Sequence, residues 1–186
     1  MADLSGYTLY SSGLKGAEAE FGRQAQRWGL NCVTYTFEGH VMDWQANVKV
    51  LSEEDLKLGD VSMEIVAKRM GRFFGNGEKI RRVLQSIFHL VNSGHDVFAV
   101  GHILADDTVK GGTGWGVELA KFFNRPLFVY DQEQKAWFAW RDGHWCADKP
   151  LIKAATFTGL GTRYLSAEGQ AAIEDLFRRS FGEPQA

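Results

Sequence analysis

The sequence predicts an α/β fold with a mostly parallel sheet, helices on both faces and a small antiparallel hairpin appendage. Short β-rich segments alternate with longer amphipathic segments, as in parallel strands joined by right-handed helical crossovers. Two glycine-rich turns each stand where a strand is expected to pass into a helix. Asp142-Gly143 separates the aromatic-rich runs 136–140 and 145–147, which predicts a hairpin appendage over about residues 133–148.

The chain is expected to open with a strand, a helix and a second strand. Residues 7–10 form a short apolar run, which indicates the first strand. Residues 17–28 place apolar side chains on one face at helical spacing, and Gly29 follows as a stop signal. Residues 32–37 are rich in β-forming residues and predict a buried strand, whereas residues 38–51 carry no clear pattern and are expected to be loop.

The next stretch is expected to be helical. Ser52 is followed by acidic residues, which is typical of a capped helix start, so part of 53–58 is expected to be helical. A further helix is expected over 61–73. Residues 75–77 break the chain with two glycines, and a long amphipathic helix is expected over 78–92.

The second half continues the alternation of strands and helices. The expected elements are a buried strand at 96–101, a helix at 114–123, a strand at 126–130 and a strand at 155–159. Ser166 is expected to cap a final helix that ends at Phe181.

Composition narrows the class of protein. A hydrophobic content of 45% and a charged content of 24% are ordinary for a globular protein, and 186 residues predict a single domain over 1–186. The net charge of −2 provides no broad basic field, so a nucleic-acid partner is not expected. No signal peptide or long apolar run is visible, so we expect a cytoplasmic protein without a membrane partner.

Metal and cofactor sites are not expected either. Cys32 and Cys146 lack metal-ligand spacing and are interpreted as reduced core thiols. The five histidines are scattered without paired spacing, so the sequence predicts no metal site and indicates no cofactor.

The two glycine-rich turns carry the strongest functional signal. Residues 11–18 read Ser-Ser-Gly-Leu-Lys-Gly-Ala-Glu, and residues 110–118 read Lys-Gly-Gly-Thr-Gly-Trp-Gly-Val-Glu. Glycine lets a backbone approach an anion closely and adopt positive φ. The following helix directs unpaired N–H groups and its positive dipole end at the turn. Together the turns predict a phosphate-bearing ligand held between two strand ends.

Both turns resemble signatures of one superfamily. The second resembles Pro-Gly-Gly-x-Gly-Thr-x-x-Glu of the Lonely Guy phosphoribohydrolases, with Lys110 in place of Pro and Trp115 in place of Thr. The first resembles Ser-Gly-Gly-Ala-x-Gly-Ala-Asp, with Ser12 and Gly13 at the two Gly positions and Glu18 at Asp. These are patterns of the Rossmann-like SLOG superfamily, which also includes the DNA-processing protein A core and YpsA-type nucleotide-binding proteins. The resemblance implies a Rossmann-like fold that binds nucleotides.

A third turn resembles the same superfamily but is out of place. Residues 159–163, Gly-Leu-Gly-Thr-Arg, resemble the Gly-x-Gly-Ser-Arg turn with which such proteins commonly begin, yet they lie near the C-terminus. The simplest interpretation is a circular permutation, and the resemblance then covers roughly 5–121 and 155–181. We therefore expect strand 156–159 to lie parallel and adjacent to strand 7–10, with the chain ends close together.

The candidate site combines these turns with one further strand end. Lys15 is expected to meet a phosphate as a point charge, and Arg163 to bind it in bidentate fashion. Asp131 ends a strand on the side where α/β folds bind ligands, although capping a turn explains it equally well. The candidate ligand-binding residues are Ser11, Ser12, Gly13, Lys15, Gly16, Gly111, Gly112, Thr113, Gly114, Trp115, Glu118, Asp131, Gly161, Thr162 and Arg163.

Glu118 distinguishes the two main functional hypotheses. In the Lonely Guy enzymes the matching glutamate supports hydrolysis of an N-glycosidic bond, so the resemblance makes Glu118 a candidate catalytic residue. Binding of a ribose hydroxyl and a structural role are the alternatives. No arginine stands at the expected catalytic spacing, which favours binding over catalysis.

The leading hypothesis is a cytoplasmic protein that binds a nucleotide or nucleotide-derived small molecule. The alternative is a nucleoside-monophosphate phosphoribohydrolase of the Lonely Guy type. Binding of single-stranded DNA, as in DNA-processing protein A, is a third hypothesis that the net acidity disfavours. The resemblance also implies a possible homo-oligomer, because relatives with this fold often pair through helices.

Overall fold

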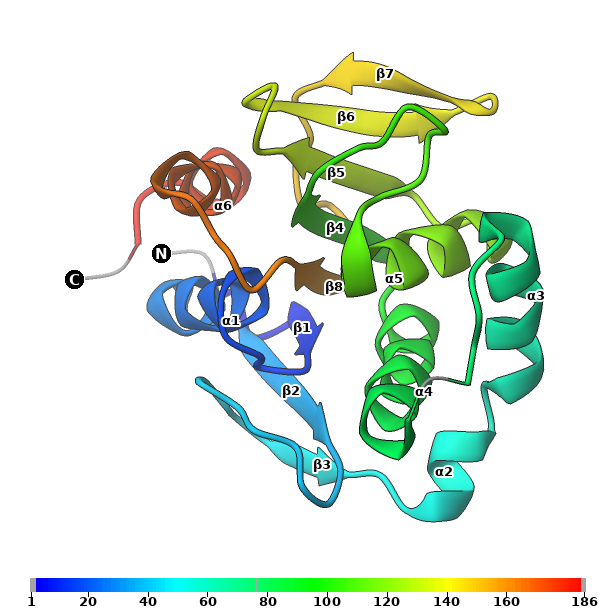
Figure 1. Cartoon of the computed structure of the whole chain (residues 1–186). Coiled ribbons are helices and arrows are strands. Elements are labelled where there is room, and N and C mark those ends of the chain that lie inside the picture. Colours follow the sequence, from blue (N-terminus) through cyan, green and yellow to red (C-terminus); the bar gives the residue numbers. More distant parts are fainter. Residues whose placement is uncertain (1–2, 76, 185–186) are drawn as a thin grey trace.

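A computed structural model describes residues 3–75 and 77–184, and its centre is one eight-stranded sheet (Figure 1). The strand order is β3-β2-β1-β8-β4-β5-β6-β7. Neighbouring strands from β3 to β5 are parallel, whereas β6 and β7 are antiparallel. The strands are β1 (Thr8–Ser11), β2 (Asn31–Thr36), β3 (Val48–Val50), β4 (Asp96–Gly101), β5 (Leu127–Asp131), β6 (Ala136–Arg141), β7 (His144–Asp148) and β8 (Thr156–Gly161).

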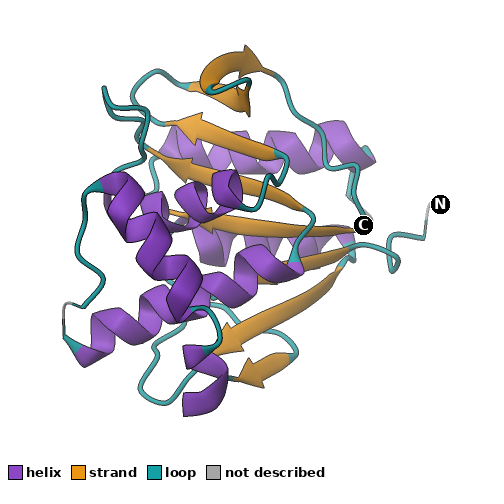
Figure 2. Ribbon diagram, turned by 90° about the vertical axis from the view of Figure 1, so that its right-hand side faces the viewer, coloured by secondary structure: helices purple, strands orange, loops and turns teal. Residues whose placement is uncertain are grey.

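Helices cover both faces of the sheet, as predicted (Figures 1 and 2). They are α1 (Ala17–Trp28), α2 (Glu53–Lys57), α3 (Asp60–Met70), α4 (Glu78–Ser93), α5 (Gly111–Phe122) and α6 (Ala167–Phe181). Alternate side chains of β4 enter different cores, because successive strand residues face opposite sides. Phe98 and Val100 pack with α1 and α6, and Val97 and Ala99 pack with α3, α4 and α5.

The strand near the C-terminus lies in the middle of the sheet. β8 is parallel to β1, with Thr8 opposite Thr156, and it also pairs with β4. The predicted adjacency of these two strands is therefore confirmed. Tyr7 and Phe181 have ring centroids 5.0 Å apart, so the segments that lead to the two ends of the chain lie close together, whereas the ends themselves lie outside the described residues.

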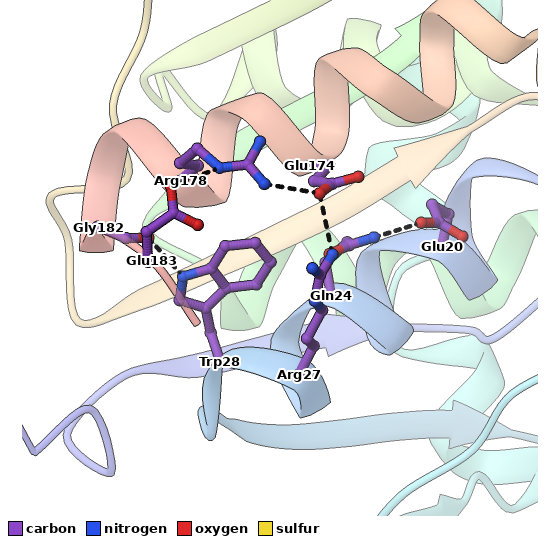
Figure 3. Close-up of polar contacts among 8 residues, drawn as sticks. All are labelled: Glu20, Gln24, Arg27, Trp28, Glu174, Arg178, Gly182 and Glu183. Carbon is purple, nitrogen blue, oxygen red and sulfur yellow. Dashed lines mark hydrogen bonds and ion pairs between the residues drawn. The ribbon is translucent and has the colours of Figure 1, made fainter. Parts of the chain in front are cut away.

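Polar contacts join the first and last helices, α1 and α6 (Figure 3). Glu174 on α6 pairs with Arg27 on α1 and with Arg178 on its own helix, each at 2.9 Å. The indole N–H of Trp28 donates to the Gly182 carbonyl oxygen at 2.9 Å. Segments at opposite ends of the sequence are thus packed as neighbours on one face of the sheet.

Several elements differ from expectation in their extent or pairing, as α3 does by ending at Met70 rather than residue 73. Residues 38–51, expected to be loop, contain the short edge strand β3, which is only three residues long and exposed throughout. Helix α5 begins at Gly111 rather than Gly114, so the glycines form its first turn. The hairpin continues the sheet through the pairing of β5 with β6.

Two further expectations concern single residues and a short segment. Cys32 is buried, but Cys146 is only half-buried and does not belong to the core. The chain break expected at 75–77 includes Asn76, which lies outside the described residues. None of the helices in the described part of the chain is both long and apolar enough to cross a membrane.

Candidate functional site

A cavity of about 680 Å³ opens at the carboxyl ends of β1, β8 and β4. The chain leaves β8 toward α6 on one face of the sheet and leaves β4 toward α5 on the other (Figure 1). Such a divergence opens a crevice between neighbouring strand ends, which is where open α/β sheets bind ligands. The cavity therefore lies where the fold itself favours a binding site.

The three glycine-containing turns meet at this cavity, as predicted. The predicted site residues that line it are Ser12, Gly111, Gly112, Thr113, Gly161, Thr162 and Arg163. They come from the β1–α1, β4–α5 and β8–α6 connections, which are far apart in sequence. Their role in binding a ligand remains a prediction.

The start of α5 offers an open anion-binding surface. Gly111 has φ of 70°, a conformation that favours glycine, and a Cβ added at Gly111 or Gly112 would meet no atom within 4 Å. The first N–H groups of a helix lack intrahelical partners. Arg72 fixes the turn by donating to the carbonyl oxygens of Gly111 and Val109, each at 3.0 Å.

The glycines of the first turn have a different role. Gly13 and Gly16 have φ of 68° and 98°. A Cβ added to Gly13 would lie 2.0 Å from the backbone oxygen of Trp44, and one added to Gly16 would lie 2.3 Å from the backbone oxygen of Thr162. The N–H of Ala17 donates to that Thr162 oxygen at 2.9 Å. Gly13 and Gly16 therefore allow close packing of the β1–α1 connection against neighbouring backbone, rather than leaving space for a ligand.

Several cationic groups border the cavity. Lys79 from α4, Lys110 from the start of α5 and Arg163 after β8 all belong to its lining and are exposed. His40 lies in range of the Arg163 charge: burial, and then that charge, lower the pKa of His40. Lys15, predicted to contact a phosphate, is exposed and does not belong to the lining.

Glu18 is the acidic residue that the structure brings to the cavity. Its residue is only 6% exposed, and the Ser12 hydroxyl donates to Glu18 Oε2 at 2.6 Å. Burial raises the pKa of Glu18 to about 7, against the opposing effects of the Ser12 hydrogen bond and the Arg163 charge. Glu18 was not a predicted site residue, although its match to the acidic position of the first turn pattern was a usable signal.

Glu118 does not line the cavity. Its Oε2 lies 3.2 Å from Lys121 Nζ, an ionic contact without hydrogen-bond geometry. Lys121 Nζ in turn lies 3.8 Å from the centre of the Trp140 ring and 5.2 Å from that of Trp145. Helix α5 therefore directs Glu118 toward the β6–β7 hairpin, and this placement favours the structural alternative for this residue.

Asp131 also serves the fold. Its carboxylate accepts hydrogen bonds from the backbone N–H groups of Ile103, Glu133 and Gln134 at 2.8–2.9 Å. Burial acts to raise the pKa of Asp131, but these hydrogen bonds outweigh it and hold the pKa below its ordinary value. Asp131 is therefore a cap for the turn after β5, one of the two roles considered for it.

The remaining predicted residues support the turns from behind. Ser11 is buried, donates to the Glu18 carbonyl oxygen at 3.0 Å and accepts from the Gly13 N–H at 3.1 Å. A Cβ on Gly114 would lie 1.9 Å from the Val109 oxygen. Trp115 packs against Phe74, with ring centroids 5.9 Å apart. None of these three predicted residues belongs to the cavity lining within the described chain.

Metal binding and similarity to known proteins give no further assignment. Over residues 3–75 and 77–184, no group of three or more His, Cys, Asp or Glu side chains is arranged to hold a metal ion. In comparisons with known proteins, no family model, no curated protein and no solved structure matched the chain.

Proposed function

We propose that this protein binds a nucleotide or nucleotide-derived small molecule in the cavity at the carboxyl ends of β1, β8 and β4. The observation that carries the proposal is the meeting of three turns there around the open first turn of α5. A volume of about 680 Å³ lies within the range of small-molecule sites. The resemblance to the SLOG superfamily, and the circular permutation that it implies, are part of the same proposal.

The proposed phosphate position is the start of α5. Exposed glycines at 111 and 112 allow an anion to approach the backbone N–H groups, and the helix dipole favours negative charge there. Lys110 and Arg163 add positive charge from two connections. These donors surround the space between two turns, which suits a phosphoryl group better than a single carboxylate.

The apolar part of the cavity lining suits the apolar part of such a ligand. Val83, Leu84 and Ile87 of α4 belong to it, together with Leu160 of β8. Small-molecule sites commonly combine apolar walls with a few placed polar groups. A nucleoside packed against α4 with its phosphate at α5 satisfies both surfaces of the cavity.

Ligand-induced stabilisation tests the proposal. A panel of nucleotides is screened by thermal shift, since a ligand at about 100 times its Kd adds about 2.7 kcal/mol to stability. Gly112→Val is expected to fold normally, because open space surrounds that position, and to lose the shift by blocking the phosphate. Gly6→Val is the matched control, because a Cβ there also meets no atom within 4 Å. Equal ligand shifts in Gly112→Val and the wild type contradict the proposed site.

Hydrolysis of an N-glycosidic bond is the second candidate function. Burial of Glu18 in the cavity favours it, because a carboxyl group with a pKa of about 7 is suited to donate a proton to a leaving base. Incubation with nucleoside monophosphates and chromatography of the free base tests this candidate. Base release that disappears in Glu18→Gln but persists in Glu118→Gln supports it, and absence of base release excludes these substrates.

A further inference from the structure

The cavity places an acidic group inside a site suited to an anion. Glu18 is largely buried on the first turn of α1, and it lines the same cavity as Gly111 and Arg163. A phosphate bound there approaches a carboxylate that water does not screen. Two negative charges in such surroundings repel each other strongly, so that one of them favours its protonated form.

Protonation of Glu18 removes the repulsion between its carboxylate and a bound anion, and it supplies a hydrogen-bond donor. A neutral carboxyl group keeps acceptor capacity for the Ser12 hydroxyl and gains one O–H that can donate to a ligand oxygen. Gln24 and Arg23 pair with the neighbouring Glu20 rather than with Glu18. Within the described residues, Glu18 is therefore not paired with a cation of its own helix.

We propose that Glu18 contacts the ligand in its protonated form, so that binding of a phosphate-bearing ligand takes up one proton from solvent. This inference rests on the proposed function, because it requires an anion at the start of α5. The step is a protonation of the Glu18 carboxylate coupled to ligand binding, and no covalent bond in the ligand changes. Glu18 thereby becomes a specificity residue, favouring ligands that offer an oxygen acceptor to its O–H.

The other charged groups at the site come from three connections and one helix. They are Lys79 on α4, His102 and Lys110 before α5, and Arg163 after β8, with His40 after β2 in range of the Arg163 charge. The cations favour ionised Glu18 in the empty cavity, and a bound anion offsets their charge. Since histidine is the other side chain whose charge changes near neutral pH, His102 and His40 need their own controls.

The geometry predicts how affinity varies with pH. Because the pKa of Glu18 is about 7 in the empty protein, the carboxyl group loses its proton as pH rises through neutrality. Above that point each pH unit is expected to weaken binding by up to about tenfold, until the pKa of the ligand-bound form is reached. Below it, affinity is expected to be constant with respect to this group.

Sulfate is the probe for the test, because its charge does not change in this range of pH. Its Kd is obtained from about pH 6 to about pH 9 by the rise in melting temperature over sodium chloride of equal ionic strength. The affinity of the wild type for sulfate is expected to fall by about tenfold or more across this range of pH. Glu18→Gln, an analogue of the protonated form, is expected to bind equally at all pH values and to match the wild type at low pH.

Matched variants isolate Glu18 from its neighbours. Glu20→Gln removes a buried carboxylate from the same helix outside the cavity lining, and it is expected to keep the wild-type dependence on pH. His102→Asn and His40→Asn are expected to keep it as well. If sulfate affinity depends on pH equally in Glu18→Gln and the wild type, the inference is overturned. It is also overturned if Glu18→Gln folds but no longer binds sulfate.

A measurement on the wild type alone completes the test. Titration calorimetry at about pH 7.5 in two buffers of different ionisation enthalpy counts the protons taken up with sulfate, and a clearly positive number is expected. Sulfate binding without proton uptake overturns the role of Glu18 but leaves the anion site intact. Absence of sulfate binding at every pH contradicts the proposed function itself and, with it, this inference.

Discussion

At the scale of single residues, the two acidic groups that follow the glycine turns differ in their relation to the cavity: the predicted residue Glu118 lies outside it, and Glu18 lines it. Glu118 lies two residues beyond Gly116, on a different face of α5 from the cavity-lining residues, and it pairs with Lys121 instead. Glu18 lies on the first turn of α1, where the Ser12 hydroxyl holds it at the cavity wall. Both residues are glutamates, so their different placement follows from the position that each occupies on its helix.

Burial of Glu18 also makes the stability of the protein depend on pH. Its pKa is raised from 4.5 to about 7, so the folded state keeps a proton that the unfolded state has lost between these values. The free energy of unfolding is therefore expected to fall as pH rises through this window, by roughly 3 kcal/mol in total. Glu18→Gln is expected to be more stable than the wild type at about pH 8 and similar to it at about pH 4.

Urea denaturation across this pH range measures the effect. Glu20→Gln is the matched control on the same helix, because Glu20 is buried but paired with Arg23 at 3.2 Å. It is not expected to reproduce the stabilisation at high pH. Parallel pH profiles for Glu18→Gln and the wild type would show that Glu18 titrates as an ordinary exposed carboxyl group.

At the scale of elements, the hairpin β6–β7 and the helix α5 stabilise each other through one lysine. Lys121 has only 8% of its side chain exposed, and its Nζ contacts Glu118, the Trp140 ring and the Asp107 carbonyl oxygen. An ammonium group over an indole face gains more when it is desolvated, as here. The aromatic-rich hairpin therefore packs against α5 with the Lys121 ammonium group between them.

This arrangement predicts coupled effects on stability. Lys121→Met is expected to cost about 1–3 kcal/mol, because it leaves the largely buried Glu118 carboxylate without its partner. In the Glu118→Gln background the same substitution is expected to cost less, and urea denaturation of the four proteins measures the coupling. Glu118→Gln is expected to keep wild-type ligand affinity, and a loss of binding in the folded variant would return Glu118 to the site.

The element boundaries that differed from expectation have local causes. Glycine disfavours helix in isolation, and the start of α5 was expected at Gly114, after Gly111 and Gly112. Arg72, from the connection between α3 and α4, fixes that first turn by two hydrogen bonds to carbonyl oxygens. Strand β3 forms only through its pairing with β2, from Thr34 opposite Val48 to Thr36 opposite Val50.

At the scale of the whole molecule, the order of the strands is the most informative property. β8 lies between β1 and β4, and α6 packs beside α1 (Figures 1 and 3). Moving β8 and α6 to the start of the chain would give the order of elements that the SLOG resemblance implies. The contacts of the sheet would not change, because only the covalent connections differ.

A permuted chain tests this relation. It begins at Lys153, in the connection between β7 and β8, and a short Gly/Ser linker joins the original ends. It is expected to fold with the wild-type circular dichroism spectrum and to keep the same ligand-induced thermal shift. Its stability is expected to change little, since the rings of Tyr7 and Phe181 already lie 5.0 Å apart.

A second permutant provides the control for folding. It uses the same linker but opens the chain inside β4, a fully buried strand, and it is expected to fail to fold. Failure of both chains would indicate that the linker does not span the ends. Failure of the first chain with a linker shown to close would contradict the proposed permutation.

The sequence by itself determined most of the helices and strands and the three turns of the site. Helical spacing placed α1 over residues 17–28, and the Ser166 cap placed the start of α6, because these signals act between residues that are neighbours in the chain. The aromatic runs around Asp142-Gly143 located the hairpin for the same reason.

Only the tertiary structure decided which of the turn residues face one cavity. Glu18 and Arg163 meet there because β8 inserts beside β1, and Glu118 turns away because α5 packs against the hairpin. Gly13 and Gly16 prove to be packing positions, whereas Gly111 and Gly112 are open. These differences depend on contacts between segments that are distant in sequence, and such contacts are set by the order of the strands and the direction of each helix rather than by local pattern.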